Sequence, residues 1–114
     1  MARSPAVRRA GWAVVIASVG GIATSVALAA TVVSVVQKGR AFATQRLDIR
    51  AGDSVRFMNE DTFIHHVFVN SATMNYNSDE QEPGQSIDVR FPVAGTFNVR
   101  CEIHPKMSLQ VDVR

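Results

Sequence analysis

Apolar and polar residues alternate in short runs along the last two thirds of this chain. Successive side chains of a strand point to opposite faces, so such alternation predicts strands with one buried and one exposed face. Turn-forming segments separate the runs, among them Ala51-Gly52-Asp53 and Pro92-Val93-Ala94-Gly95. The strands are expected at residues 31–36, 46–50, 54–58, 67–69, 87–91, 96–101 and 109–113. Because no amphipathic helical pattern accompanies them, we expect an all-β fold, either an antiparallel sandwich or a small barrel.

A polar stretch, residues 70–85, interrupts this pattern and is expected to be a loop that Glu82-Pro83-Gly84 closes. It contains a cluster of acidic residues, Asp79, Glu80 and Glu82. The simpler interpretation is a solvated loop, which we favour. The alternative is that these acids guide a basic partner toward the protein.

The first forty residues have a different character. Arg3, Arg8 and Arg9 precede a run of 25 residues, 12–36, that contains no charged side chain. One interpretation is an apolar signal-peptide helix over residues 1–29, with Ala27-Leu28-Ala29 as the cleavage site. The other is an uncleaved membrane anchor, for which the run is long enough. Residues 31–36 are β-branched at five of six positions, which favours a strand there and therefore cleavage.

Residues 30–114 are therefore expected to form one exported domain, periplasmic or otherwise outside the cytoplasm. Residues 12–36 would hold it to a membrane only if the N-terminal segment is retained. The domain has 85 residues, enough for one modest core, and we expect a monomer.

The charge distribution argues against nucleic acid as a partner. The formal net charge is +2, but three of the 12 Lys and Arg residues precede the apolar run and all ten acidic residues follow it. From residue 30 onward, nine Lys or Arg residues oppose ten Asp or Glu residues. No basic patch is evident in this pattern.

Residues able to bind a metal gather near the end of the chain. Cys101, His104 and Met107 lie within seven residues, so the loop that leaves the strand at 96–101 can direct all three side chains to one point. Cys101 is in phase with Val99 and should face inward. It is the only cysteine, so it cannot form an internal disulfide, and metal ligation would protect it in an exported protein. A cysteine with two histidines and a distant methionine is the ligand set of blue-copper sites.

The second imidazole must come from His65 or His66, the two remaining histidines. They are neighbours at the start of a strand, so they face opposite ways and only one can reach the site. Spacing alone does not choose between them. If Val67 and Val69 face the core, parity places His65 inward with them and leaves His66 facing solvent, without a metal role.

Each candidate ligand also has an ordinary interpretation. Cys101 can be a small buried hydrophobic residue, His104 an exposed loop residue and Met107 a core side chain. The combination Cys-x₂-His-x₂-Met with a distant histidine favours a metal site over three unrelated roles. Zinc fits two histidines and a cysteine with an open position, but the methionine favours copper.

These segments resemble the cupredoxins, in particular the plastocyanin- and amicyanin-like small blue-copper proteins. The resemblance spans about residues 31–114 and is carried by Ala51-Gly52-Asp53-Ser54-Val55, by Asn59-x-Asp61-x-x-x-His65, and by Gly95-Thr96-Phe97 leading to Cys101-x-x-His104-x-x-Met107. It implies a Greek-key β-sandwich that binds one type 1 copper ion through His65, Cys101, His104 and Met107. The two-residue gap between His104 and Met107 is more similar to amicyanin than to plastocyanin. Glu102-Ile103 departs from the Thr/Ser-Pro that often follows the family's cysteine.

The ligand set predicts a small electron carrier in which copper cycles between Cu(I) and Cu(II). We do not expect an enzyme, because no acid–base pair or substrate pocket is apparent from the sequence. Redox partner proteins are expected to dock weakly and transiently near His104, with Pro105 and Met107 as an apolar patch. The alternatives are a copper chaperone or storage module, which would hold Cu(I) without cycling, and a metal-free β-sandwich interaction domain.

Overall fold

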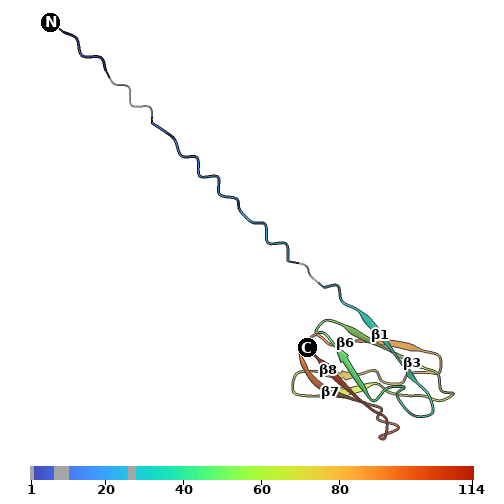
Figure 1. The fold of residues 1–114 in the computed structure, drawn as a ribbon. Coiled ribbons are helices and arrows are strands. Elements are labelled where there is room, and N and C mark those ends of the chain that lie inside the picture. Colours follow the sequence, from blue (N-terminus) through green and yellow to red (C-terminus); the bar gives the residue numbers. More distant parts are fainter. Residues whose placement is uncertain (1, 7–10, 26–27) are drawn as a thin grey trace.

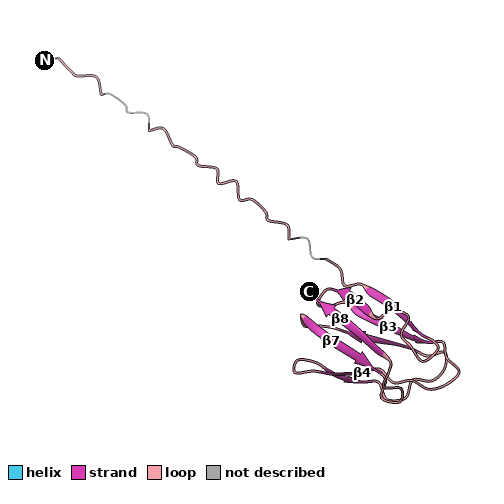
Figure 2. Ribbon diagram, turned by 60° about the horizontal axis from the view of Figure 1, so that its bottom comes forward, coloured by secondary structure: helices cyan, strands magenta, loops and turns pink. Residues whose placement is uncertain are grey.

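Two β-sheets pack face to face in the folded part of the protein (Figures 1 and 2). The computed structural model describes residues 2–6, 11–25 and 28–114. Within these ranges the strands are β1 (Val32–Gln37), β2 (Arg46–Ile49), β3 (Ser54–Asn59), β4 (Phe68–Asn70), β5 (Asn75–Asn77), β6 (Ser86–Arg90), β7 (Gly95–Arg100) and β8 (Ser108–Val113). One sheet has the order β1-β3-β6 and the other has the order β2-β8-β7-β4-β5. The all-β prediction is confirmed for the part of the chain that the structure describes.

The core lies between the sheets because alternate residues of each strand point inward. In β3, Val55 and Phe57 are buried while Arg56 between them is exposed. In β8, Leu109 and Val111 are buried in the same way. The other buried apolar residues of the strands are Val35, Ile49, Val69, Val89, Phe97, Val99 and Val113. Both sheets therefore contribute to one continuous core.

Two features of the sheets differ from the sequence prediction. Strand β5 lies inside the stretch that we expected to be a loop, where it pairs with β4 and places Tyr76 opposite Val69. Strand β5 has only three residues, and Tyr76 is half-buried between two exposed asparagines. An alternation this short cannot be recognised in the sequence without the partner strand. The pairs β1–β3 and β2–β8 are parallel, not antiparallel.

The N-terminal apolar helix predicted from the sequence is not supported. Residues 11–25 and 28–31 contain no helix, and their large apolar side chains are exposed, for example Trp12 at 93% and Ile22 at 90%. A helix gains most of its stability by packing an apolar face, and nothing in the described chain covers this segment. In these ranges no helix is long and apolar enough to cross a membrane. Residue 27, in the predicted cleavage site, lies outside the described residues.

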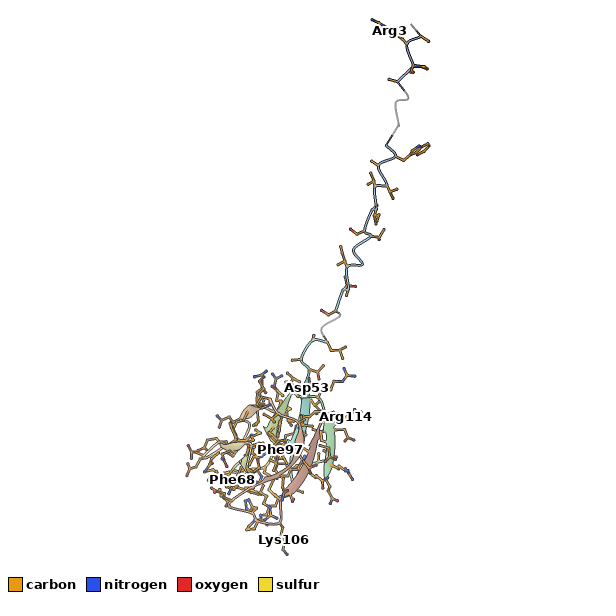
Figure 3. The ribbon with its side chains drawn as sticks, turned by 90° about the vertical axis from the view of Figure 1, so that its left-hand side faces the viewer. Arg3, Asp53, Phe68, Phe97, Lys106 and Arg114 are labelled. Atoms are coloured by element: carbon orange, nitrogen blue, oxygen red, sulfur yellow. The ribbon has the colours of Figure 1, made fainter. Side chains whose placement is uncertain are left out.

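The strand ends form two poles, with Asp53 and Arg114 at one pole and Lys106 at the other (Figure 3). The chain enters β1 at the first pole, where the Thr31 N–H donates to the Asp53 carboxylate at 2.9 Å. Strands β3 and β7 start at this pole and end at the opposite one. The segment after β3 and the loop after β7 therefore meet at the pole of Lys106.

Candidate metal centre

Two loops at the Lys106 pole bring His65, Cys101 and His104 together. Cys101 directly follows β7, and residues 101–107 connect β7 to β8. This loop is tight, since the Met107 N–H donates to the carbonyl oxygen of His104 at 2.9 Å. His65 lies between β3 and β4, where its N–H and carbonyl oxygen form hydrogen bonds with Gln81 of 3.0 and 2.8 Å. Both loops are thus anchored by backbone hydrogen bonds close to the ligand residues.

His65 faces inward, as the alternation predicts. His65 and Val67 are both 0% exposed, and Val69 is 1% exposed. The prediction for His66 is wrong in part, because its side chain is only 18% exposed and its Nδ1 lies 3.2 Å from Glu102 Oε2. Its ring is not part of the ligand cluster, yet its backbone N–H donates to Cys101 Sγ at 3.2 Å. His66 therefore contributes to the centre through its main chain.

The three candidate ligand atoms form a small triangle. Cys101 Sγ lies 3.9 Å from His65 Nδ1 and 3.8 Å from His104 Nδ1. All three atoms lie within 4.8 Å of one another. Sulfur and nitrogen donors that bind one ion at about 2.3 and 2.0 Å, with an angle near 120°, are themselves about 3.7 Å apart. The spacing therefore fits one ion in a trigonal site, and this sulfur and imidazole donor set fits copper.

Asp61 orients His65 from outside the ligand set. Its Oδ2 lies 2.6 Å from His65 Nε2, and the two side chains are 8% and 0% exposed. The same carboxylate accepts the backbone N–H groups of Gly39 at 2.7 Å and Arg40 at 3.2 Å. Burial acts to raise the pKa of Asp61, but the hydrogen bonds from His65, Gly39 and Arg40 outweigh burial and lower it. An ionised Asp61 holds the proton of His65 on Nε2 and leaves Nδ1 free to bind a metal.

Asn59 fixes the loop that carries Asp61. Asn59 is 1% exposed and ends β3. Its amide nitrogen donates to the carbonyl oxygens of Phe63 and Gln81 at 2.9 and 3.1 Å, and its amide oxygen accepts the Asp61 N–H at 2.9 Å. The buried amide is fully engaged, so this segment has one well-defined path between Asn59 and His65.

Phe63 packs against both imidazoles. Its ring centroid lies 5.2 Å from that of His65 and 5.4 Å from that of His104, and the two imidazoles are 5.1 Å apart. Contacts of this kind restrict rotation of the rings. Burial lowers the pKa of His104, and the positive charge of Arg40 acts in the same direction. A lowered pKa favours the neutral imidazole, which is the form that binds a metal.

Met107, the fourth predicted ligand, is 1% exposed and belongs to the buried core cluster. It is the last residue before β8, where the alternation of the strand directs it inward. The prediction that Met107 contributes to an exposed apolar docking patch is therefore wrong. Ile103, which is 47% exposed, and the exposed Pro105 occupy that surface instead.

Sequence reasoning missed the residues that support the ligands. Asn59 and Asp61 stand in a motif of the resemblance, but they had no predicted role, and Phe63 was not singled out. A carboxylate four residues before a candidate histidine was the available signal for Asp61. The donation from His66 to the sulfur had no such signal, because every residue except proline carries a backbone N–H.

Comparison with solved structures identifies the fold. A mutant of amicyanin in the Cu(I) form is 22% identical, with 73% of this chain and 82% of that chain covered and a TM-score of 0.68. A Cu-containing nitrite reductase from Thermus scotoductus SA-01 is 26% identical over 72% of this chain and 22% of that chain, with a TM-score of 0.66. A purple cupredoxin from Nitrosopumilus maritimus is 18% identical over 72% of this chain and 99% of that chain, with a TM-score of 0.64. The fold is therefore cupredoxin-like.

Sequence comparison identifies the family. No curated protein matches the chain. The family model for copper binding proteins of the plastocyanin/azurin family matches residues 29–114. Within this range His65, Cys101 and His104 bring three metal-binding atoms within 4.8 Å of one another, and Met107 directly precedes β8 at the end of the same loop. The chain belongs to the plastocyanin/azurin family of copper-binding proteins.

Proposed function

We propose that this protein is an exported electron carrier that binds one type 1 copper ion through His65, Cys101, His104 and Met107. The observation that carries the proposal is the approach of two imidazole Nδ1 atoms to Cys101 Sγ, at 3.9 and 3.8 Å. Copper bound by this set supplies a one-electron couple between Cu(I) and Cu(II). The residues around the copper determine the rate of electron transfer and the reduction potential.

The surroundings of the ligands favour rapid electron transfer because they restrain the ligand atoms in both oxidation states. Asp61 and Gln81 fix His65 at its side chain and its backbone. Phe63 packs on both imidazoles, and the His66 N–H donates to the sulfur. Ligands that barely move on oxidation need little reorganisation for each transfer, and the hydrogen bond to the sulfur tunes the potential.

His104 is the route that we assign to the electron. His65 is fully buried, whereas His104 is partly exposed in the loop between β7 and β8. A partner that docks over this loop comes closest to the centre through the His104 ring. We expect such encounters to be weak and transient, with the protein itself a monomer.

Loading the protein with Cu(II) tests the proposal. The expected result is an intense visible absorption band from charge transfer between thiolate and copper, together with a reversible one-electron wave in voltammetry. Cys101→Ser is the matched control and should lose the band. Tightly bound but colourless copper would contradict a type 1 site. A coloured site that does not oxidise and reduce reversibly would favour a chaperone or storage module.

A carrier has no substrate turnover of its own. Because the fold is shared with 22% of the chain of a Cu-containing nitrite reductase, nitrite is the relevant substrate to assay. The reduced, copper-loaded protein is expected to leave nitrite unchanged beyond the rate of the Cys101→Ser variant. Sustained nitrite reduction would assign an enzymatic role instead.

Export is inferred from the N-terminal segment, with a basic start and an uncharged run over residues 12–36. Cleavage after residue 29 would leave every strand intact, since β1 starts at Val32 and Thr31 makes the contact with Asp53. A retained segment would instead anchor the domain 30–114 to a membrane. Mass spectrometry of the protein recovered from the periplasmic and membrane fractions distinguishes the two.

A further inference from the structure

A cationic residue beside the metal centre has an unusual backbone conformation. Arg40 has a φ of 54°, directly after Gly39 with a φ of 64°. This left-handed region is unfavourable for a residue with a Cβ atom, and such strain persists only where the surrounding structure imposes it. Here Asp61 imposes it, because its carboxylate accepts the N–H groups of both residues. The carboxylate that orients His65 therefore also positions Arg40.

The side chain of Arg40 is placed by Phe63. The guanidinium carbon lies 4.9 Å from the centroid of the Phe63 ring, in a cation–π contact. The same ring lies 5.4 Å from the His104 ring. Arg40 is exposed, so its charge is held at the rim of the centre and faces solvent. A merely solvated arginine needs neither a strained backbone nor an aromatic support.

Arg40 and Lys106 flank a shallow surface groove formed with Ile103, His104 and Pro105. Both charged residues of this groove are positive, although residues 30–114 carry nine Lys or Arg against ten Asp or Glu. The apolar centre includes Ile103, which is 47% exposed. This groove therefore combines an electron-route histidine, an apolar contact and two cations.

A second groove shares Arg40, Ile103 and His104 with the first. It contains one acid, Glu82, together with Phe63 and Pro83. Glu102 at the start of the ligand loop is engaged by the His66 ring. Of the residues that line the two grooves, one is acidic, Glu82, and two are cationic, Arg40 and Lys106.

We propose that this face recognises an acidic patch on the redox partner, with Arg40 and Lys106 binding its carboxylates. Ile103 and Pro105 pack against the apolar centre of the partner and bring His104 close to its acceptor or donor. This inference rests on the proposed carrier function and adds the charge of the partner. A guanidinium suits carboxylates because it donates two parallel hydrogen bonds, and charges at a rim act mainly on the association rate.

Small redox reagents of opposite charge test the proposal. Hexacyanoferrate(III) takes one electron from the reduced protein and becomes hexacyanoferrate(II), while the protein is left oxidised. At low ionic strength Arg40→Gln and Lys106→Gln are each expected to slow this reaction about three- to tenfold, from the Coulomb energy of one charge against a trianion. Oxidation by the tricationic tris(phenanthroline)cobalt(III) should become faster in the same variants. Both effects should shrink at high salt.

Arg90→Gln is the matched control, because it makes the same change in net charge at the pole of Asp53, away from Lys106. Its rates should stay close to those of the unmodified protein. Equal effects from Arg90→Gln and Arg40→Gln would overturn the proposal, since they would report only the net charge. If the unmodified protein still shows the visible band and the reversible wave, the carrier function stands even when this proposal fails. If the unmodified protein lacks both, the carrier function itself is contradicted.

A peptide probe tests recognition of carboxylates directly. Deca-aspartate is titrated into the ¹⁵N-labelled, Cu(I)-loaded protein at low salt and followed by amide chemical shifts. We expect the shifts at residues 38–41, 62–64 and 101–107, and their loss in the Arg40→Gln/Lys106→Gln double variant. Shifts centred on any other surface, or unaltered by the double variant, would contradict the assignment.

Discussion

Asp61 Oδ2 lies 2.6 Å from His65 Nε2, across the imidazole from the Nδ1 atom that faces Cys101 at 3.9 Å. One nearly buried carboxylate therefore determines which nitrogen of His65 is free for a metal. Because it also accepts the N–H groups of Gly39 and Arg40, it connects the end of β1 to the ligand. The position of His65 thus depends on a residue that binds no metal itself.

Replacing Asp61 by Asn is expected to weaken copper binding about 10- to 100-fold, the usual cost of losing the partner of a ligand histidine. The neutral amide offers one oxygen to three N–H donors, and its own NH₂ group would face some of them. Competition with a chromogenic Cu(I) chelator measures the affinity. Asp88→Asn, which changes an exposed ion pair with Arg56, is the control and should bind copper normally. An Asp61→Asn affinity equal to that of the control would refute the positioning role.

Two adjacent histidines allow a paired test of the site. His65→Ala removes an Nδ1 atom of the triangle and should abolish the visible band. His66→Ala should keep the band, because alanine retains the backbone N–H that donates to Cys101 Sγ. Absorption spectra of both copper-loaded variants, compared at equal protein concentration, distinguish the roles. If the two substitutions abolish the band equally, the assignment of His65 as the ligand fails.

Local patterns account for the parts of the structure that the sequence predicted well. Alternation reports which face of a strand is buried, so β3 and β8 and the inward direction of His65 follow from it. The spacing of Cys101 and His104 is equally local, because one loop carries both. The burial of Cys101, at 1% exposed, follows from its phase with Val99.

Contacts between distant segments account for the parts that the sequence did not predict. The hydrogen bond from Gly39 to Asp61 joins residues 22 apart, and the strained φ of Arg40 exists only because of it. Strand β5 is visible only once β4 lies beside it. The apolar N-terminal run is a further example. Its hydrophobicity predicts that it is buried, but it does not indicate which surface buries it. Such features depend on partners that no local window contains.

Asp53 at the opposite pole makes stability depend on pH. Its carboxylate accepts the N–H groups of Thr31 and Arg50, both at 2.9 Å, and these hydrogen bonds lower the pKa of Asp53 below its ordinary value of 3.8. A lowered pKa in the folded state contributes stability above the unfolded value, and this contribution is lost as the pH falls through the folded value. The window for this loss therefore lies below about pH 5.

Asp53→Asn is expected to lower the melting temperature of the copper-free protein at neutral pH by a few degrees. The difference from the unmodified protein should narrow as the pH falls through the window, because protonation removes the same interaction there. Thermal unfolding at several pH values measures it, with copper absent so that pH-dependent loss of the metal does not contribute. Asp48→Asn, an exposed acid near the same pole, is the control. A difference that stays constant down to the lowest pH would contradict this account.

Copper should stabilise the whole fold, because its ligands come from segments far apart in the chain. His65 and Cys101 are separated by 36 positions, so an ion that binds both opposes separation of the two loops. With free metal about 1,000-fold above the dissociation constant, binding to the folded state alone adds about 4 kcal/mol to the free energy of unfolding. For a domain of this size that corresponds to a rise of roughly 15 °C or more in melting temperature. Calorimetry of the copper-free and Cu(I)-loaded protein checks this, with Cys101→Ser as the variant that should gain much less. Equal melting temperatures with and without copper would mean that the ion does not hold these two segments together.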